Sequence, residues 1–480
     1  MYHSTRGKKE VLASVALMEG IAEDGGLYIT DIKPVEIEEF KGLSYRDMAK
    51  KIISLYLDDL DYEDIYDAID KAYEKGFDCQ ELVELKNFAS CSFLELYHGP
   101  TIAFKDMALT VLPHLLLKAK KKNKRTEKTI ILTATSGDTG AAALNGFKDL
   151  PNTEIIVFYP YNGVSDIQER QMLSYQGTNA KVIAVKGNFD DCQSFVKKVF
   201  TDSLIKEKLE KKNTRLSSAN SINIGRLVPQ IVYYFYSYMQ LVKREEIKMG
   251  DEINFCVPTG NFGNILAGHY AKRMGLPIKK LICASNKNNI LTDFFNSGTY
   301  DCNREFYKTN SPSMDILISS NLERLLFEHT DDVSSLMDDL KKDKAYHLDM
   351  MTDEFFASYA NEEETLAAIK QCFMENKYLI DTHTAVAYHV YKDYVKKTND
   401  LTKTVIVSTA SPYKFAPSVT KALGLEECDE FAEIINLNKI SNCPIHPSID
   451  KLMNIELSRI VWDKDELMKN LLELLVINDD

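Results

Sequence analysis

The pattern of apolar and polar positions divides the chain into an N-terminal part with helical spacing and a longer part in which strands and helices alternate. Apolar residues recur three and four positions apart over Tyr45–Leu60 and Tyr62–Lys75, with carboxylates between them. This spacing predicts amphipathic helices. Beyond that region, short β-branched runs are each followed by turn residues and then by helical spacing; the runs are Thr129–Ala134, Glu154–Tyr159, Lys181–Val185, Ile253–Val257, Leu281–Ala284 and Thr404–Thr409.

Repeats of strand, loop and helix predict an α/β fold, with parallel-type sheets flanked by helices and ligands bound at the carboxyl ends of the strands. The long helical stretch Ile222–Arg244 separates the runs into two groups, so we expect two sheet-bearing units with a cleft between them. We place a helical N-terminal region at 1–95, a smaller α/β domain at 96–235 and a larger α/β domain at 236–480. The charged stretch Thr330–Lys344 predicts a solvated helix or loop.

Composition and charge exclude several classes of protein. The 480 residues are 45% hydrophobic and 27% charged, which is typical of globular proteins with large cores. A net charge of −13 argues against binding to nucleic acid or to anionic lipid. The apolar stretches are too short to cross a bilayer, and the N-terminus carries no signal-peptide pattern. We therefore expect a cytoplasmic protein that binds neither nucleic acid nor membrane.

The cysteines and histidines predict neither disulfides nor a metal site. Nine cysteines are an odd number, are widely spaced and include no C-x-x-C pair, so we interpret them as reduced thiols. The nine histidines lack the spacing of metal ligands.

Two loops that follow predicted strands have the composition of anion-binding turns. Within Val257–Met274, Gly260 and Gly263 allow close approach of the backbone, and Asn264 begins a helix whose free N–H groups and dipole attract a phosphate. The alternative is an ordinary turn between strand and helix, because glycine and asparagine are common turn formers.

The second loop lies within Ala134–Phe147. Its backbone amides and hydroxyl groups could bind a carboxylate or another phosphate; they belong to Ser136, Gly137, Asp138, Thr139 and Gly140. Asp138 could instead serve only as a helix N-cap. Because the chain contains two such loops, we favour anion binding.

Lys105 has an unusually apolar setting for a lysine. It follows a Gly-Pro turn and lies beside Phe104, Met107 and Ala108. Loss of hydration lowers the pKa of an amine and favours the free base that covalent catalysis on carbonyl compounds requires. The alternative is a lysine whose amine simply extends to the surface.

Eight short motifs occur in a fixed order along almost the whole chain: STRG (Ser4–Gly7), HGPTIAFKDMA, TATSGDTGAA, ANSINIGR, VPTGNFGN, SPSMDI, DTHTAVA and STASPYKF (Ser408–Phe415). In these motifs and their order the chain resembles the threonine synthase family, pyridoxal-phosphate enzymes of fold type II, the tryptophan-synthase-β-like class. The resemblance implies pyridoxal 5'-phosphate as cofactor and Lys105 as the lysine bonded to it. It also implies a cofactor-phosphate loop of Gly260, Asn261, Phe262, Gly263 and Asn264, and a contact of Thr409 with the pyridine nitrogen.

The activity that the resemblance implies is conversion of O-phospho-L-homoserine and water to L-threonine and phosphate, the last step of threonine biosynthesis, by a monomer or homodimer. The loop Ser136–Thr139 would hold the substrate α-carboxylate. The substrate phosphate needs its own basic site, whose candidates are Lys414, Arg226 with Ser221 and Asn223, and Arg170.

Several alternatives remain open at this point. Each cation could be a structural ion-pair partner, and His383 could be a buried histidine satisfied by backbone instead of an acid catalyst. Ser411 stands where many relatives carry histidine, which argues against proton transfer at that position and leaves Thr409 and Lys414 in place. The rival activities are a serine or threonine dehydratase, or a threonine-synthase-like phospho-lyase that releases a keto acid. A non-catalytic binding protein on the same fold is a further alternative.

Overall fold

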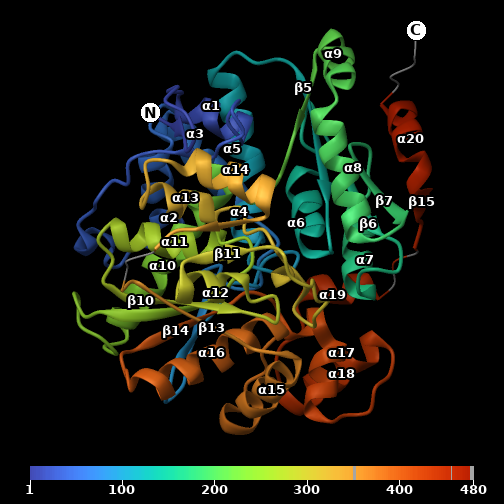
Figure 1. Ribbon diagram of the computed structural model, residues 1–480. Coiled ribbons are helices and arrows are strands. Elements are labelled where there is room, and N and C mark those ends of the chain that lie inside the picture. The colour runs from blue at the N-terminus through green and yellow to red at the C-terminus, as the bar shows by residue number, and fades with distance from the viewer. Residues whose placement is uncertain (350–352, 454, 456, 476–480) are drawn as a thin grey trace.

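Two larger sheets organise the computed structural model, which describes residues 1–349, 353–453, 455 and 457–475 (Figure 1). The six-stranded sheet has the order β13-β10-β9-β14-β4-β3. Its strands pair in parallel, except that β3 is antiparallel to β4. They are β3 (Glu84–Asn87), β4 (Ser92–Glu95), β9 (Ile253–Pro258), β10 (Ile278–Ser285), β13 (Phe355–Tyr359) and β14 (Thr404–Ser408).

The five-stranded sheet has the order β15-β7-β6-β5-β8, and its neighbouring strands are parallel. Its strands are β5 (Lys128–Ala134), β6 (Thr153–Pro160), β7 (Ala180–Lys186), β8 (Thr214–Ser217) and β15 (Ile460–Asp463). Two small antiparallel pairs lie outside these sheets: β1 (His3–Ser4) with β2 (Tyr28–Ile29), and β11 (Thr299–Asp301) with β12 (Ala345–His347).

The predicted α/β class with parallel-type sheets is confirmed. Five of the six predicted runs fall inside β5, β6, β7, β9 and β10, and the sixth overlaps β14, which ends one residue earlier at Ser408. The strands β3, β4, β8, β13 and β15 were not predicted, because they are short and most of them mix polar with apolar residues. The charged segment near residue 340 forms a largely exposed helix, α14 (Val333–Asp343).

Helices cover both faces of each sheet, which explains the nearly continuous apolar runs of the central strands. In β9, Phe255 and Val257 belong to one core with α10 (Ile224–Lys243) and α11 (Gly263–Arg273). Cys256, between them, belongs to another core with α16 (Thr382–Thr398).

The five-stranded sheet is buried in the same way. One face shares the main core with α6 (Asp138–Phe147). The other face packs with α8 (Phe189–Thr201) and with α20 (Leu467–Leu474), which lies beside β15 at the outer edge of the molecule (Figure 1). Since residues of both sheets belong to the main core, the two sheets share one continuous apolar interior.

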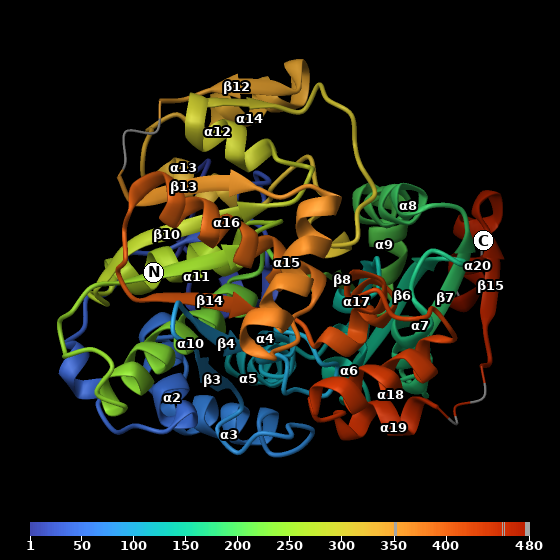
Figure 2. The ribbon, with the colours of Figure 1, turned by 90° about the horizontal axis from the view of Figure 1, so that it is seen from below.

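The remaining helices surround these layers. Those preceding β5 are α1 (Ala13–Glu19), α2 (Tyr45–Tyr56), α3 (Tyr62–Ala72), α4 (Asp106–Leu109) and α5 (Leu112–Lys122). Those within and after the five-stranded sheet are α7 (Asp166–Ser174) and α9 (Ser203–Lys211). Later ones are α12 (Ile290–Ser297), α13 (Leu322–Phe327), α15 (Glu362–Asn376), α17 (Ala416–Leu423), α18 (Glu430–Ser441) and α19 (Pro447–Leu452). The last three lie together in the lower right part of Figure 2.

Both sheets take strands from distant parts of the chain. β15 comes from the C-terminal part, whereas β3 and β4 precede residue 96 and join the six-stranded sheet. The domain boundaries at residues 95 and 235 stay a prediction. Among the described residues, no helix combines the length and the apolar character needed to cross a membrane.

Candidate active site

Lys105 and Asp138 meet where loops from the two sheets face each other. Lys105 immediately precedes α4, in the chain that leaves the carboxyl end of β4, and Asp138 is the first residue of α6 after β5. The Lys105 amine lies 3.5 Å from Asp138 Oδ2 and 3.1 Å from Ser313 Oγ. This position at the carboxyl ends of parallel strands is the one that the sequence predicts for a ligand site.

The Lys105 side chain is buried, so the alternative of an amine that extends to the surface is wrong. Lys105 is only 9% exposed. The pKa of its amine is lowered to about 8, chiefly by burial; Asp138 opposes the shift, whereas the neighbouring Lys414 and Arg226 add to it. A substantial fraction of this amine is therefore neutral near pH 7.5.

Asp138 is the negative centre of the site. Its Oδ1 lies 3.1 Å from the Lys414 amine and accepts a hydrogen bond of 2.9 Å from Gln168 Nε2. Its Oδ2 accepts from Ser313 Oγ at 3.0 Å. Burial raises the pKa of the Asp138 carboxyl, but Lys414 and Lys105 outweigh it and hold the pKa well below its usual range.

The alternative that Asp138 merely caps α6 is wrong. Gly137 is the N-cap residue, so the Asp138 side chain does not cap this helix. Gly137 has φ +128°, and a Cβ there would come within 2.4 Å of Gln168 Cδ, so the turn requires glycine. Thr135 Oγ1 accepts hydrogen bonds from the amides of Gly137 and Gly140, both at 2.9 Å. A contact between Ser136–Thr139 and the substrate carboxylate stays a prediction.

The loop from Gly260 to Asn264 follows β9 and starts α11, as the sequence predicts. A Cβ on Gly260 would lie 2.7 Å from the carbonyl oxygen of Ser313, so the two segments pack backbone against backbone. Phe262 adopts the left-handed conformation at the N-cap, and no side chain caps the helix. Asn264 Oδ1 accepts from the hydroxyls of Tyr233 and Tyr234, at 2.7 and 2.8 Å.

Arg226 lies in the first turn of α10 and is 3% exposed. It donates from Nη1 to the carbonyl of Ala219 at 2.8 Å, and no ion pair with it occurs within the described part of the chain. Burial lowers the pKa of this guanidinium to about 10. An uncompensated cation in this position suits an anionic ligand.

These features fit a phosphate-bearing cofactor together with a second anionic group. Asn264 Nδ2 and Arg226 Nε are buried donors without a hydrogen-bond partner, and such donors are rare in proteins unless a ligand or water satisfies them. The amino end of α11 adds N–H groups without a side-chain cap. A lysine with a lowered pKa completes the set.

Several other candidate residues have structural partners. Asn223 caps α10 by accepting from the Gly225 amide at 2.8 Å and donates to the carbonyl of Leu17 at 3.0 Å. Arg170 forms an ion pair with Asp166 at 2.8 Å on α7, as its structural alternative expects. Their contacts with substrate stay predictions.

His383 is a buried histidine satisfied by its surroundings. Its Nε2 accepts the N–H of Ser313 at 3.2 Å, and its Nδ1 lies 2.9 Å from Asp381 Oδ1. Because Nε2 is an acceptor, the ring proton resides on Nδ1 and is donated to Asp381. This arrangement favours orientation of the Ser313 segment over acid catalysis.

Thr409 and Lys414 lie just beyond the carboxyl end of β14. The Thr409 carbonyl accepts the N–H of Phe104 at 2.8 Å, which fixes the chain next to Lys105. Lys414 is fully buried and donates to the carbonyl of Thr101 at 2.8 Å in addition to its ion pair with Asp138. Binding of the pyridine nitrogen by Thr409 stays a prediction.

Ser313 and Gln168 contact the site without having been predicted. Ser313 lies in the SPSMDI motif, in a short 3-10 turn that carries no strand or helix signal. Gln168 is the third residue of α7 and completes a capping box with Ser165. The spacing S-x-x-Q indicates that helix start, but the contact with Asp138 depends on tertiary packing.

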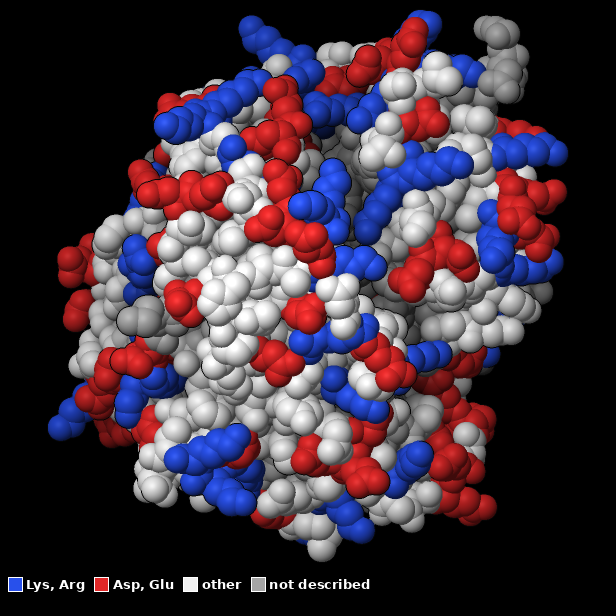
Figure 3. All heavy atoms as spheres, viewed as in Figure 1, with Lys and Arg blue, Asp and Glu red and all other residues white. Residues whose placement is uncertain are grey.

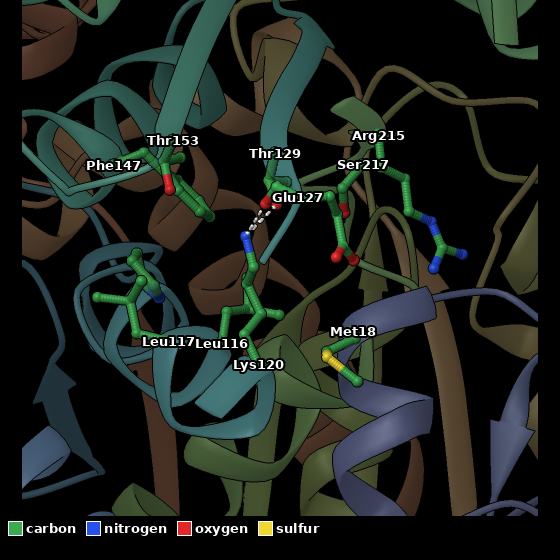
Figure 4. Close-up of a pocket in the computed structure, with 11 residues that line it drawn as sticks. Met18, Leu116, Leu117, Lys120, Glu127, Thr129, Phe147, Thr153, Arg215 and Ser217 are labelled. Atoms are coloured by element: carbon green, nitrogen blue, oxygen red, sulfur yellow. Dashed lines mark hydrogen bonds between the residues drawn. The ribbon is translucent and has the colours of Figure 1, made fainter. Parts of the chain in front are cut away.

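A separate hollow lies near the amino-terminal ends of β5 and β6 (Figure 4). Met18, Leu116 and Phe147 give it an apolar wall. Lys120, at its edge, donates to the carbonyl of Glu127 at 2.6 Å and to Thr129 Oγ1 at 3.0 Å. Since Asp138 follows the opposite end of β5, this hollow is distinct from the Lys105 site.

Known family models match successive and partly overlapping parts of the chain. The model described as "Threonine synthase N terminus" matches residues 1–73, "Pyridoxal-phosphate dependent enzyme" matches 80–410, and "Threonine synthase, C-terminal" matches 384–455.

Individual relatives agree with these matches. Threonine synthase-like 1 of Homo sapiens is 39% identical over 442 residues, which cover 87% of this chain and 58% of that protein. The chain thus spans little more than half of that relative. Threonine synthase of Schizosaccharomyces pombe is 37% identical, with 88% and 89% of the two chains covered. The crystal structure of threonine synthase from Brucella melitensis with PLP bound superimposes with a TM-score of 0.87 at 35% identity, covering 99% of this chain and 98% of that one.

Proposed function

The chain belongs to the threonine synthase family of pyridoxal-phosphate-dependent enzymes, and from this membership we propose that it converts O-phospho-L-homoserine and water to L-threonine and phosphate. Such an enzyme is a carbon–oxygen lyase acting on a phosphate ester, in which elimination of phosphate precedes addition of water.

The observation that carries this proposal is the grouping of a buried, partly neutral lysine with buried cations. Lys105 supplies the amine, whose pKa is lowered to about 8 mainly by burial, and Lys414 and Arg226 are close enough to act in the same direction. A doubly anionic phosphate group suits such a concentration of positive charge in a protein whose net charge is −13.

We assign the cofactor to Lys105, Thr409 and the loop Gly260–Asn264. Lys105 would form the covalent bond, and the uncapped amino end of α11 with Asn264 Nδ2 would bind the cofactor phosphate. When bound, pyridoxal phosphate supplies an electron sink that makes the proton on the amino-bearing carbon acidic.

The residues around Lys105 would then manage protons and charge. The neutral amine would take the proton from Cα and serve the later transfers at Cβ and Cγ, before water adds at Cβ. Asp138 and Ser313 hold this amine in place when it carries a proton, since both lie within 3.5 Å of it. Arg226 would stabilise the departing phosphate, because its Nε is buried without a partner.

A phospho-lyase that releases a keto acid is the second candidate. The cofactor loop and Lys105 suit both activities equally, so the products must decide.

The deciding experiment is a product analysis of the full chain with pyridoxal phosphate and O-phospho-L-homoserine. We expect threonine and phosphate in equal amounts, and loss of turnover in Lys105→Ala but not in the surface variant Lys121→Ala. Release of 2-oxobutyrate and ammonia with little threonine would favour the phospho-lyase. A protein that gains no visible absorbance band with added cofactor would favour the binding protein.

We also expect a cytoplasmic monomer or homodimer. All nine cysteines carry free thiols, and five of them are buried, which suits a reducing compartment. Fractionation of the source cells and light scattering of the purified chain would test these two expectations.

A further inference from the structure

We propose that Asn321 and Arg324 are positioning residues that hold the backbone carbonyls behind the predicted cofactor-phosphate loop, so that the loop amides remain available to the phosphate. This inference rests on the proposed use of Gly260–Asn264 to bind the cofactor. Neither residue lies within one of the eight sequence motifs.

Two carbonyl groups of the cofactor-phosphate loop accept hydrogen bonds from the segment that contains Ser319 and Asn321. Asn321 donates to the carbonyl of Asn261 twice, from Nδ2 at 3.0 Å and from its backbone N–H at 3.1 Å. Ser319 Oγ donates to the carbonyl of Gly260 at 2.7 Å. With two successive carbonyls fixed in this way and Phe262 in the left-handed conformation, the following N–H groups are available to form an anion-binding nest.

Arg324 fixes Asn321 in turn. It is 1% exposed and donates to Asn321 Oδ1 at 2.5 Å, to the carbonyl of Tyr28 at 3.0 Å and to the carbonyl of Ile222 at 2.6 Å. No carboxylate lies within ion-pair distance of it in the described ranges of the chain. Burial lowers the pKa of this guanidinium.

A buried arginine of this kind adds little to stability, because removing its charge from water costs free energy. Apolar side chains of similar volume often stabilise such sites as well or better. Its planar fork instead sets the direction of several acceptors at once. The binding of three acceptors from three separate segments is therefore better explained by positioning than by stability alone.

Asn321 and Arg324 also contact the segment just before Arg226, the residue proposed to bind the substrate phosphate. Asn321 Nδ2 lies 3.3 Å from the carbonyl of Ser221, and Arg324 holds the carbonyl of Ile222. These carbonyls immediately precede the start of α10, whose first turn carries Arg226. Asn321 and Arg324 thus form one clamp. This clamp fixes both the cofactor-phosphate loop and the start of α10, the helix that carries Arg226.

The N-terminal segment supports this clamp. Arg6 forms an ion pair of 2.7 Å with Glu323, the neighbour of Arg324, and Thr5 Oγ1 donates to the same carboxylate at 2.5 Å. Both residues belong to the STRG motif. The STRG motif therefore has a structural role, because it supports the clamp although the two are more than 300 positions apart in the sequence.

The test compares the affinity of the full chain for pyridoxal 5'-phosphate and for pyridoxal, which lacks the phosphate, by titration of visible absorbance. Asn321→Asp keeps the shape and lets Arg324 form an ion pair, but it removes the side-chain donor to the carbonyls of Asn261 and Ser221 and leaves only the backbone N–H of residue 321 bonded to Asn261. We expect its dissociation constant for pyridoxal phosphate to rise at least tenfold and that for pyridoxal to change less than twofold. Arg324→Lys should show the same selectivity.

Asn179→Asp is the matched control, because Asn179 also donates to two carbonyls, those of Phe147 and Thr153, away from the loop. It should leave both constants unchanged. An equal loss for both ligands in Asn321→Asp, or no loss for either, would overturn the positioning role. A wild-type chain that binds neither ligand would overturn the cofactor assignment together with this inference, whereas the other outcomes leave that assignment intact.

Discussion

At Lys105, burial and charge act on a single amine, and their balance sets the pH at which the site can work. Burial is the largest effect on its pKa, Lys414 and Arg226 act in the same direction, and Asp138 acts against them. The result is a pKa of about 8, so about a quarter of the amine is neutral at pH 7.5, compared with about 0.1% for an ordinary lysine.

The rate at which Lys105 bonds to added pyridoxal phosphate should follow this ionisation. The neutral amine is the reactive form, so the rate of appearance of the visible band should rise with pH and level off above about pH 8. Stopped-flow absorbance over pH 6 to about 10 measures this. An inflection at the pH of an unperturbed lysine would contradict the assigned environment.

The sequence predicts Lys105 itself but not the groups that surround it. A lysine among apolar neighbours carries a local signal, and so do the glycines of the two loops. Ser313 and Gln168 carry none, because they reach Lys105 and Asp138 only after α7 and a 3-10 turn pack against loops more than 25 positions away in sequence. Asn321 and Arg324 could not be predicted either, because their contacts also join segments that are distant in the sequence.

Among the elements, the central strands are the ones that sequence predicts well. β5, β6, β9 and β10 are buried on both faces and therefore present continuous apolar runs, whereas β3, with the sequence ELKN, and β8, with TRLS, lie at sheet edges and mix polar residues. β15 carries a short apolar run, but its pairing with β7 joins residues more than 270 positions apart, which no local pattern reveals.

The loop between β9 and α11 depends on the absence of a side chain at Gly260. In Gly260→Ala the new Cβ would meet the Ser313 carbonyl oxygen at 2.7 Å, so one backbone must move. We expect a loss of about 1–3 kcal/mol in the free energy of unfolding and at least a tenfold weaker affinity for pyridoxal phosphate. Denaturant unfolding and absorbance titration measure the two effects.

Gly177→Ala is the control for this substitution, since the nearest atom to a Cβ there lies 3.8 Å away and the backbone conformation suits alanine. Its stability and cofactor affinity should match those of the wild-type chain. Wild-type behaviour of Gly260→Ala would show that the loop tolerates a shift and would weaken its assignment as the phosphate site.

On the scale of the whole molecule, positive charge is concentrated against an acidic background. The chain carries 58 basic and 71 acidic residues, yet lysines and arginines gather around the hollow at the upper centre of the face seen in Figure 3. Inside the protein, Lys105 and Lys414 pair with the carboxylate of Asp138, and Arg226 is close enough to lower the pKa of the Lys105 amine. This distribution favours a small anionic substrate over an extended polyanion.

The central claim is that the chain eliminates phosphate from O-phospho-L-homoserine and adds water to the carbon skeleton. The most direct measurement is turnover in water labelled with oxygen-18, followed by mass spectrometry of both products. We predict one labelled oxygen in the hydroxyl group of threonine and none in the released phosphate, because the carbon–oxygen bond breaks. Labelled phosphate with unlabelled homoserine would show hydrolysis at phosphorus instead and would contradict the account.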